Sequence, residues 1–327
     1  MNIRKLLSAA AASVMAMSLL CSCGQSGVLR LGTGNTGGNY YSYGTLLHEL
    51  DENGIEVKKT AGSQANLRLM NEGFIDMAIV QSDVLSEAVN GVGDFENEPV
   101  SGVRAVAGLY DEAFQIVVRS KSDINSIADL KGKKISVGDE GSGVAKNAEY
   151  LLLSAGVAFS SVEPVYMSYS DSAAALESGD IDAFFAIIGT PATVVSELAE
   201  STDIRIIAPD SRTIEYMLNI YKGYSEITIP AGTYHGQDED IPTIGVKAVL
   251  VADSDTDRQD ITALLFGKSS SIKYSVAVPE PDTEFAVSDI PCSFHQGAAD
   301  HYASVGITVS TDPENDGNSF IFGAQDN

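Results

Sequence analysis

The sequence predicts an α/β protein made of two similar lobes with a ligand cleft between them. The main observation is a short sequence motif, the repeated phrase, that occurs in both halves of the chain. Residues Glu72–Asp76 end a helical run and open an apolar strand, and Ser178–Asp182 do the same. In addition, each half has a glycine-rich loop between a strand and a helix, at 34–38 and 138–143. Repeats this far apart indicate two α/β units rather than a solenoid, whose repeats span about 20–50 residues.

The charge and composition of the chain exclude several classes of partner. The 327 residues include 45 Asp plus Glu against 20 Lys plus Arg, which gives a formal net charge of −25. A surface this acidic repels phosphate backbones and anionic lipid headgroups, so we expect no nucleic-acid partner. With 44% hydrophobic residues, the chain has enough apolar material for a globular core.

The first residues resemble a bacterial lipoprotein signal peptide. Two basic residues precede an apolar stretch, 6–20, that is too short for a membrane-spanning helix. The stretch ends in Leu20-Cys21-Ser22-Cys23, which is similar to a lipobox, whose last cysteine receives a diacylglyceryl group after cleavage. We therefore predict a signal peptide over 1–22 and lipidation at Cys23. The protein would then be extracytoplasmic and held at the bacterial cell membrane, in the periplasm or on the outer face, by its lipid alone. An ordinary secretory signal cut elsewhere is the alternative.

Strands and helices alternate along almost the whole body of the chain. The predicted strands are 29–31, 56–59, 75–80, 103–107, 115–118, 135–137, 164–167, 181–188, 204–208 and 244–252. The predicted helices are 41–50, one around 67–70, 143–155, 171–178, 191–200, 211–221, 258–268 and 295–305. This alternation favours parallel sheets covered by helices on both faces. The segment 229–242 has too many Gly, Pro and acidic residues for either element, so we expect a long ordered loop or a crossover.

The glycine loop of the first half contains a literal G-x-G-x-x-G over Gly32–Gly37. In a dinucleotide-binding fold an acidic residue should follow near the end of the second strand, but Glu56 stands at the start of that strand. We therefore expect no nicotinamide cofactor. A helix N-terminus with free backbone N–H groups still favours an anion such as a carboxylate. The alternative is that these glycines only shape a tight turn.

The sequence shows no catalytic or metal-binding constellation. Ser142 lacks the glycine two residues earlier that the G-x-S-x-G motif of serine hydrolases requires. Cys292 and His295 are neighbours in sequence, which is not how Cys/His catalytic pairs are assembled. His235 lies beside the acidic run Asp238–Asp240, which could hold a hard cation, yet such loops are more often only solvated. We predict neither an enzyme nor a metalloprotein.

Seven segments of the chain resemble the TAXI family, the solute receptors of one class of TRAP transporters. They are 32–41, 60–69, 76–84, 128–138, 180–185, 229–237 and 295–298. They cover nearly all of the chain after the signal peptide, in order and without large gaps. The chain departs from the common family pattern at His235, where proline is frequent, so the resemblance says least about that loop.

The resemblance implies a bilobed periplasmic-binding-protein-like fold (type II) that closes around a small solute. The receptor would be a monomer that delivers its ligand to the membrane subunits of a TRAP permease. Known family ligands are mostly small carboxylates, including glutamate and 2-oxoglutarate. Lobe 1 would combine 26–118 with 243–327, and lobe 2 would be 119–242.

The expected ligand-binding residues lie where predicted strands end and helices begin. In lobe 1 they are Thr36, Gly37, Gly38, Asn39, Tyr40, Tyr41, Ser63, Asn66, Gln81 and Ser82. In lobe 2 they are Gly141, Ser142, Gly143, Ile188 and Gly189. Two other functions stay open at this point, a sensor of the same fold that does not serve transport and a hydrolase or transferase on a bilobed scaffold.

Overall fold

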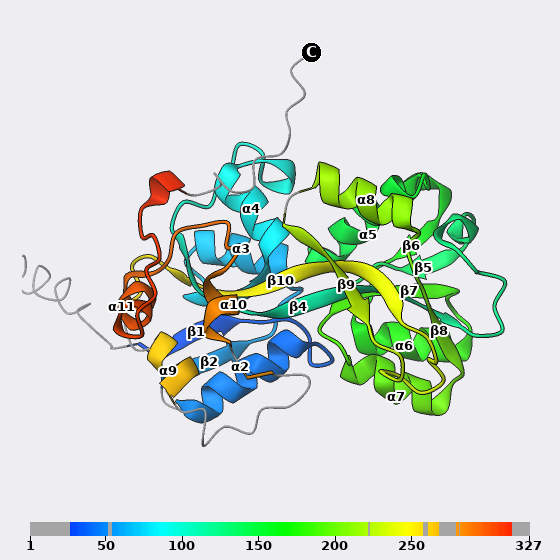
Figure 1. Ribbon diagram of the computed structural model, residues 1–327, viewed down its shortest axis with the longest axis horizontal. Helices are drawn as coiled ribbons and strands as arrows, with labels where there is room; N and C mark the ends of the chain where they lie inside the picture. Colours follow the sequence, from blue (N-terminus) through cyan, green and yellow to red (C-terminus); the bar gives the residue numbers. More distant parts are fainter. Residues whose placement is uncertain are drawn as a thin grey trace, which may run out of the picture.

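Two α/β lobes lie side by side in the structure (Figure 1), a computed structural model. It describes residues 27–51, 54–221, 223–257, 261–267, 279–280 and 282–315. The predicted signal peptide, 1–22, and the predicted lipidation site, Cys23, lie outside the described residues. Within the described residues, no helix is both long enough and apolar enough to cross a membrane.

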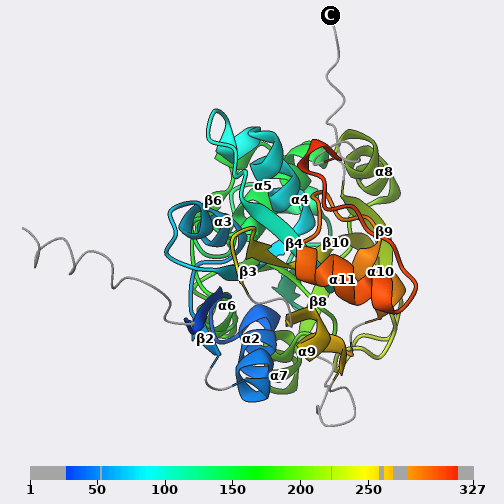
Figure 2. The same ribbon diagram turned by 90° about the vertical axis from the view of Figure 1, so that its left-hand side faces the viewer.

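The first lobe, lobe 1, is built on a sheet with the strand order β2-β1-β3-β10-β4. Its own strands are β1 (Leu29–Gly32), β2 (Ile55–Lys58) and β3 (Met77–Gln81). Its helices are α2 (Asn39–Leu50), α3 (Ser63–Asn71), α4 (Ser82–Asn90), α9 (Ile261–Gly267), α10 (Thr283–Val287) and α11 (Gln296–Ser304). The last three come from the C-terminal part of the chain and lie together on one side of the lobe (Figure 2).

The second lobe, lobe 2, repeats the arrangement with the order β6-β5-β7-β4, and β8 pairs with β4. Its strands are β5 (Lys134–Ser136), β6 (Glu163–Val165), β7 (Ala183–Ile188), β8 (Ile204–Ile207) and β9 (Tyr224–Ile229). Its helices are α5 (Gly143–Ser154), α6 (Tyr169–Ser178), α7 (Thr193–Ser201) and α8 (Ser211–Ile220).

Two long strands, β4 (Val103–Arg119) and β10 (Ile241–Asp253), run through both lobes (Figure 1). They pair antiparallel with each other, so the sheets are mixed and the expectation of parallel sheets is wrong for these strands. The prediction of two separate strands, 103–107 and 115–118, is also wrong. Asp111 and Glu112 interrupt the apolar pattern there, but β10 pairs with both residues and keeps the backbone extended.

The loop at 230–240 connects β9 to β10, which pair antiparallel with Ile229 opposite Ile241. It is therefore a hairpin connection rather than a crossover. Strand β9 itself is missing from the predicted elements. Its residues are mostly exposed or half-buried along a sheet edge, so its sequence lacks the apolar run that marks the buried strands.

The repeated sequence phrase has the same structural role in both lobes. Asp76 accepts a hydrogen bond from the backbone N–H of Arg30 at 2.8 Å, and Asp182 accepts one from the backbone N–H of Lys134 at 2.9 Å. Each carboxylate thereby ties the turn before one strand to its parallel neighbour, β3 to β1 and β7 to β5. The prediction of two similar α/β units is confirmed.

Separate hydrophobic cores stabilise the two lobes. One core fills lobe 1, and two pack on opposite faces of the lobe 2 sheet, so that adjacent Phe184 and Phe185 belong to different cores. Along β4 the change of lobe falls between Tyr110 and Ala113, and along β10 between Val246 and Ala248. The boundaries expected at 118 and 242 stay predictions.

Candidate functional site

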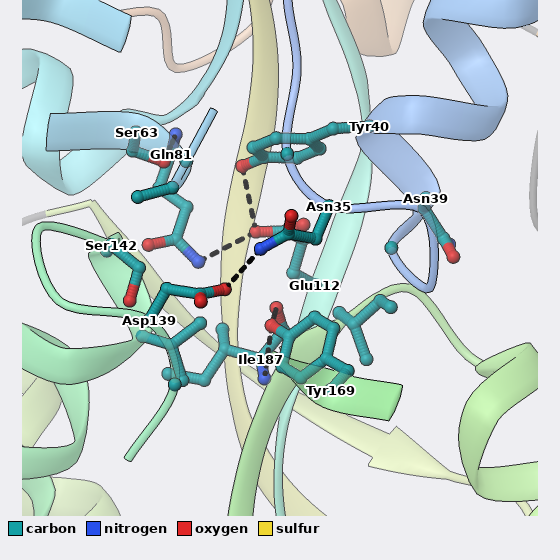
Figure 3. Close-up of a pocket in the computed structure, with 18 of the residues that line it drawn as sticks. Asn35, Asn39, Tyr40, Ser63, Gln81, Glu112, Asp139, Ser142, Tyr169 and Ile187 are labelled. Atoms are coloured by element: carbon teal, nitrogen blue, oxygen red, sulfur yellow. Dashed lines mark hydrogen bonds between the residues drawn. The ribbon is translucent and has the colours of Figure 1, made fainter. Parts of the chain in front are cut away.

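A pocket opens between the two lobes, with a cavity volume of about 60 Å³ (Figure 3). Its walls come from loops that follow β1, β2 and β5 and from the ends of β3 and β7, where open α/β sheets bind ligands. The lining residues are Gly34, Asn35, Gly37, Gly38, Asn39, Tyr40, Ala61, Gly62, Ser63, Gln81, Glu112, Gly138, Asp139, Ser142, Gly143, Val144, Tyr169, Ile187 and Ile188.

Helices from both lobes begin at this pocket. Helix α2 starts at Asn39, and its N-cap residue, Gly38, provides no side-chain hydrogen bond to the first turn. Helix α5 starts at Gly143, where the Ser142 hydroxyl caps the backbone N–H of Ala145 at 3.1 Å. The first N–H groups of an α-helix have no partner within the helix, and they favour negative charge. The N-terminus of α2 in particular offers backbone donors to an anion.

Direct contacts join the lobes beside the pocket. The Asn35 amide donates to Asp139 Oδ2 at 2.7 Å (Figure 3), and the backbone N–H of Ala65 donates to the carbonyl of Gly141 at 3.1 Å. At Gly143 the approach is so close that an added Cβ would lie 1.8 Å from Gln81 Oε1. The structure therefore represents a closed arrangement of the lobes.

Glu112 from β4 lies at the floor of the pocket and is only 2% exposed. Its Oε2 accepts hydrogen bonds from Gln81 Nε2 at 2.8 Å and from the Tyr40 hydroxyl at 3.2 Å (Figure 3). Among the described residues, nothing donates to its other oxygen, Oε1. Burial raises the pKa of Glu112 to about 8, because no charged partner compensates the loss of water.

The pocket lacks the cationic side chains that commonly bind acidic ligands. Among the described residues that line it, none is Lys, Arg or His, whereas two, Glu112 and Asp139, are acidic. Burial also raises the pKa of Asp139. The amide nitrogen of Asn39 is buried against Gly189 and has no hydrogen-bond partner.

A second contact between the lobes, which we call the latch, lies along α5 beyond the pocket. It consists of Asp83, Glu87 and Asp94 from lobe 1 and Lys146, Asn147, Tyr150 and Tyr224 from lobe 2. Lys146 forms ion pairs with Glu87 and, at 3.2 Å, with Asp94. The Tyr150 hydroxyl donates to Glu87 at 3.0 Å.

Asp83 is the second buried acid of the latch. It accepts hydrogen bonds from Asn147 Nδ2 and from the Tyr224 hydroxyl, both at 2.9 Å. Asn147 Nδ2 also lies 3.1 Å from Gln81 Oε1, so one glutamine links the latch to the pocket floor. Every acidic side chain of the latch therefore meets a donor from the opposite lobe.

A sequence model described as the NMT1-like family matches residues 31–306. The chain belongs to the NMT1-like family. The match runs from β1 to α11 and includes every residue that lines the pocket.

Solved structures share the fold of this NMT1-like protein at low sequence identity. A protein from Bordetella bronchiseptica RB50 has a TM-score of 0.51 at 20% identity, over 87% of this chain and 83% of that one. PhnD1 from Prochlorococcus marinus, in complex with methylphosphonate, has a TM-score of 0.50 at 13% identity, over 76% and 87%. The periplasmic aliphatic sulphonate binding protein SsuA from Escherichia coli has a TM-score of 0.42 at 18% identity, over 74% and 75%. The fold is the expected bilobed, periplasmic-binding-protein-like one.

The structure of this NMT1-like protein brings many of the residues expected at the ligand together. Gly37, Gly38, Asn39, Tyr40, Ser63, Gln81, Ser142, Gly143 and Ile188 line the pocket. Thr36 lines a separate polar hollow on the other side of the glycine loop. Their contacts with a ligand stay predictions.

Other expected residues have structural partners around the pocket. The Asn66 amide donates to the carbonyls of Thr33 and Ile79 and so bridges β1 and β3. The Ser82 hydroxyl accepts from the backbone N–H of Lys247, and Gly189 packs closely against Asn39. Gly141 contributes its carbonyl to the contact between the lobes. Tyr41, in the first turn of α2, is not among the residues that line the pocket.

Several lining residues were not among those expected from the sequence. They are Gly34, Asn35, Ala61, Gly62, Glu112, Gly138, Asp139, Val144, Tyr169 and Ile187. Glu112 could have been found, because an acidic residue within an apolar strand is costly to bury and therefore indicates a site. Within the described part of the chain, no group of three or more His, Cys, Asp or Glu side chains is placed to hold a metal ion.

Proposed function

We propose that this protein is an extracytoplasmic solute receptor that captures a small organic acid by closing its lobes. The observation that carries the proposal is the pocket between the lobes, which is lined by the uncapped N-terminus of α2 and by the Gln81–Glu112 pair. The membership in the NMT1-like family and the bilobed fold support it. Glutamate-like and 2-oxoglutarate-like carboxylates are the ligands to test first.

The second part of the proposal is delivery to a TRAP-type permease by a monomeric receptor of the TAXI family. Its support is the set of sequence segments that resemble that family. PhnD1 and SsuA carry names of proteins that bind phosphonates and sulphonates, so the ligand panel should include those anions. A gene for a fused TRAP membrane subunit next to this one would support this part, and an adjacent ABC-type permease would contradict it.

The third part is attachment to the membrane by a diacylglyceryl group on Cys23 after removal of residues 1–22. Its support is the lipobox-like ending of the signal sequence. Mass spectrometry of the protein purified from its native membrane should detect the modified cysteine as the N-terminal residue. An unmodified N-terminus at another position would exclude the lipid anchor.

The receptor function itself is tested by a thermal-shift screen followed by calorimetry. A ligand present at a hundred times its dissociation constant should stabilise the protein by about 2.7 kcal/mol, which a shift in melting temperature reveals. The panel should hold dicarboxylates, 2-oxo acids, amino acids, sulphonates, phosphonates and neutral sugars. Stabilisation by a sugar alone, or turnover of an ester or amide substrate, would contradict a receptor for organic acids.

A further inference from the structure

We propose that the pocket selects a ligand that carries an ammonium group beside its carboxylate, an amino acid, and that Glu112 is the residue that receives this ammonium group. This inference rests on the proposed function. It narrows the ligand from small organic acids to those with a positive charge close to the carboxylate. Glu112 would then distinguish an amino acid from the oxo acid or hydroxy acid with the same carbon skeleton.

The first observation behind this assignment is the charge of the pocket wall. Glu112 and Asp139 line the pocket, and none of the described lining residues is a Lys, Arg or His. A ligand with negative charge alone would find no cation in this wall, and its charge would oppose ionisation of the two carboxyl groups. A zwitterion does not meet this penalty, since it can turn its ammonium group toward the carboxylates.

The second observation is the geometry of Glu112. Both of its described hydrogen-bond donors, Gln81 Nε2 and the Tyr40 hydroxyl, reach the same oxygen, Oε2 (Figure 3). These two bonds fix the carboxyl group on β4 and leave Oε1 without a donor from the described residues. An ammonium group supplies three donors and a charge, which is what a buried carboxylate without a cation lacks.

The third observation concerns the other end of the ligand. Gly38 and Asn39 at the start of α2 line the pocket, and the first backbone N–H groups of this helix receive no side-chain cap. These donors suit a carboxylate. Donors on one side and an open acceptor on the other match the two ends of an amino acid within one small cavity.

The raised pKa of Glu112 also predicts the direction in which the ligand affinity depends on pH. The groups that face it or share its pocket are the phenols of Tyr40, Tyr110 and Tyr169 and the carboxyls of Asp83, Asp111 and Asp139. Burial raises the pKa of each phenol well above its ordinary value, so these groups stay neutral near pH 8. Since burial raises the pKa of Glu112 to about 8, the ligand-free carboxyl is mostly protonated below that pH.

An ammonium ligand needs the ionised form of Glu112 and must displace its proton. Its affinity should therefore rise by up to about tenfold per pH unit between pH 6 and pH 8. An acid without an ammonium group would instead use the protonated carboxyl as a donor, and its affinity would fall above pH 8. The two possibilities have opposite slopes. Lys146 of the latch also has its pKa lowered to about 8 by burial, so a variant at Glu112 must assign the slope.

The test is calorimetry with matched pairs of probes, namely alanine with pyruvate, serine with hydroxypyruvate, and glutamate with 2-oxoglutarate. For at least one pair we expect the amino acid to bind at least tenfold more tightly, with affinity rising toward pH 8. In Glu112→Gln, which keeps the side-chain shape, we expect the preference to disappear and the pH profile to become flat. Lys146 is unchanged in that variant, so a slope that persists would belong to the latch and would overturn the role of Glu112.

The possible failures are distinguishable. If the oxo acids bind the wild-type protein as tightly as the amino acids, the receptor function stands and the selection by Glu112 is overturned. If neither series binds, this inference is overturned, while the receptor function is decided by the wider panel of acids. The preference of the wild-type protein is measured without any variant, so poor folding of Glu112→Gln cannot hide the result.

Discussion

The pocket and the latch are two parts of the same contact between the lobes, and they treat buried acidic side chains in opposite ways. In the latch, Glu87 has the ammonium group of Lys146 and the hydroxyl of Tyr150 as partners from the other lobe. In the pocket, Glu112 receives hydrogen bonds from neutral groups of lobe 1, Gln81 and Tyr40. Glu87 thus has a cation as its partner when the lobes are closed, whereas no described residue supplies a cation to Glu112.

The comparison separates two uses of a buried charge. A carboxylate whose partner comes from the opposite lobe stabilises closure, because opening removes that partner. A carboxylate without a cation costs free energy until a ligand supplies one. Substitutions in the two regions should therefore have effects of opposite sign.

The largest destabilisation of the closed arrangement is expected for Lys146→Met in the latch. Removal of one partner of a buried ion pair costs about 3–5 kcal/mol, because the remaining carboxylate, here Glu87, stays buried without compensation. Opening of the lobes lets water reach Glu87, so the substitution should shift the protein toward an open state. Small-angle scattering should show a larger radius of gyration, and ligand affinity should fall with the closed population.

The matched control is Lys133→Met in lobe 2. Lys133 also forms a lysine–carboxylate pair, with Asp123 at 2.7 Å, but this pair lies at the surface within one lobe. It should change neither the radius of gyration nor the affinity. If Lys146→Met scatters like the wild-type protein, the latch does not hold the lobes closed.

Glu112→Gln should increase the free energy of unfolding. This effect is of intermediate size and opposite in sign to that of Lys146→Met. The pKa of Glu112 in the folded protein is about 8, above its ordinary value, so the folded state holds an extra proton between about pH 4.5 and pH 8. Stability from this group is complete below about pH 4.5 and is lost as the pH rises toward 8. The glutamine variant avoids that loss and should be about 2–3 kcal/mol more stable at pH 7.

Urea unfolding of both proteins at pH 4 and at pH 7 measures this difference. The stabilisation should be present at pH 7 and nearly absent at pH 4. A variant that is less stable than the wild-type protein at pH 7 would mean that Glu112 is compensated in the folded state, and the contrast with the latch would fail.

The smallest of the three effects is expected for Gly143→Ala, at the junction of pocket and latch. An added Cβ would displace Gln81 Oε1, and Gln81 cannot move freely because it also donates to Glu112 and contacts Asn147. Overpacking of this kind costs about 1–3 kcal/mol, and here it should weaken closure and ligand affinity. Gly102→Ala is the control, because its Cβ would meet its nearest neighbour at an ordinary 3.4 Å. Equal affinities for both variants, measured by calorimetry, would show that the close approach at Gly143 is not needed.

Local sequence patterns predicted most of the fold because both lobes are built from short βα units with clear strand ends. The repeated Asp76 and Asp182 phrases mark equivalent turns, and the structure gives them equivalent hydrogen bonds. The crossing strands were harder to predict. Their continuity depends on pairing between β4 and β10, which lie far apart in the sequence, and local propensity contains no information about that pairing.

The residues of the candidate site also fall into a group that local sequence patterns could predict and a group that they could not. The glycine loops and the helix starts at Gly38 and Ser142 could be predicted, because glycine and capping residues act locally. Glu112 and Tyr169 were missed, because one lies in the middle of a strand and the other begins a helix without a motif. Their place in the pocket follows only from the approach of the lobes.

The continuous strands β4 and β10 have a mechanical consequence for the motion of the lobes. A loop hinge can swing almost freely, but two strands joined by hydrogen bonds form a ribbon that bends and twists elastically. The pairing of β10 with β4 shifts register between Ala248 and Val249 and again between Leu250 and Val251, and irregular pairing of this kind makes a ribbon easier to bend. Opening and closing of the lobes would therefore bend and twist this ribbon and not only a loop.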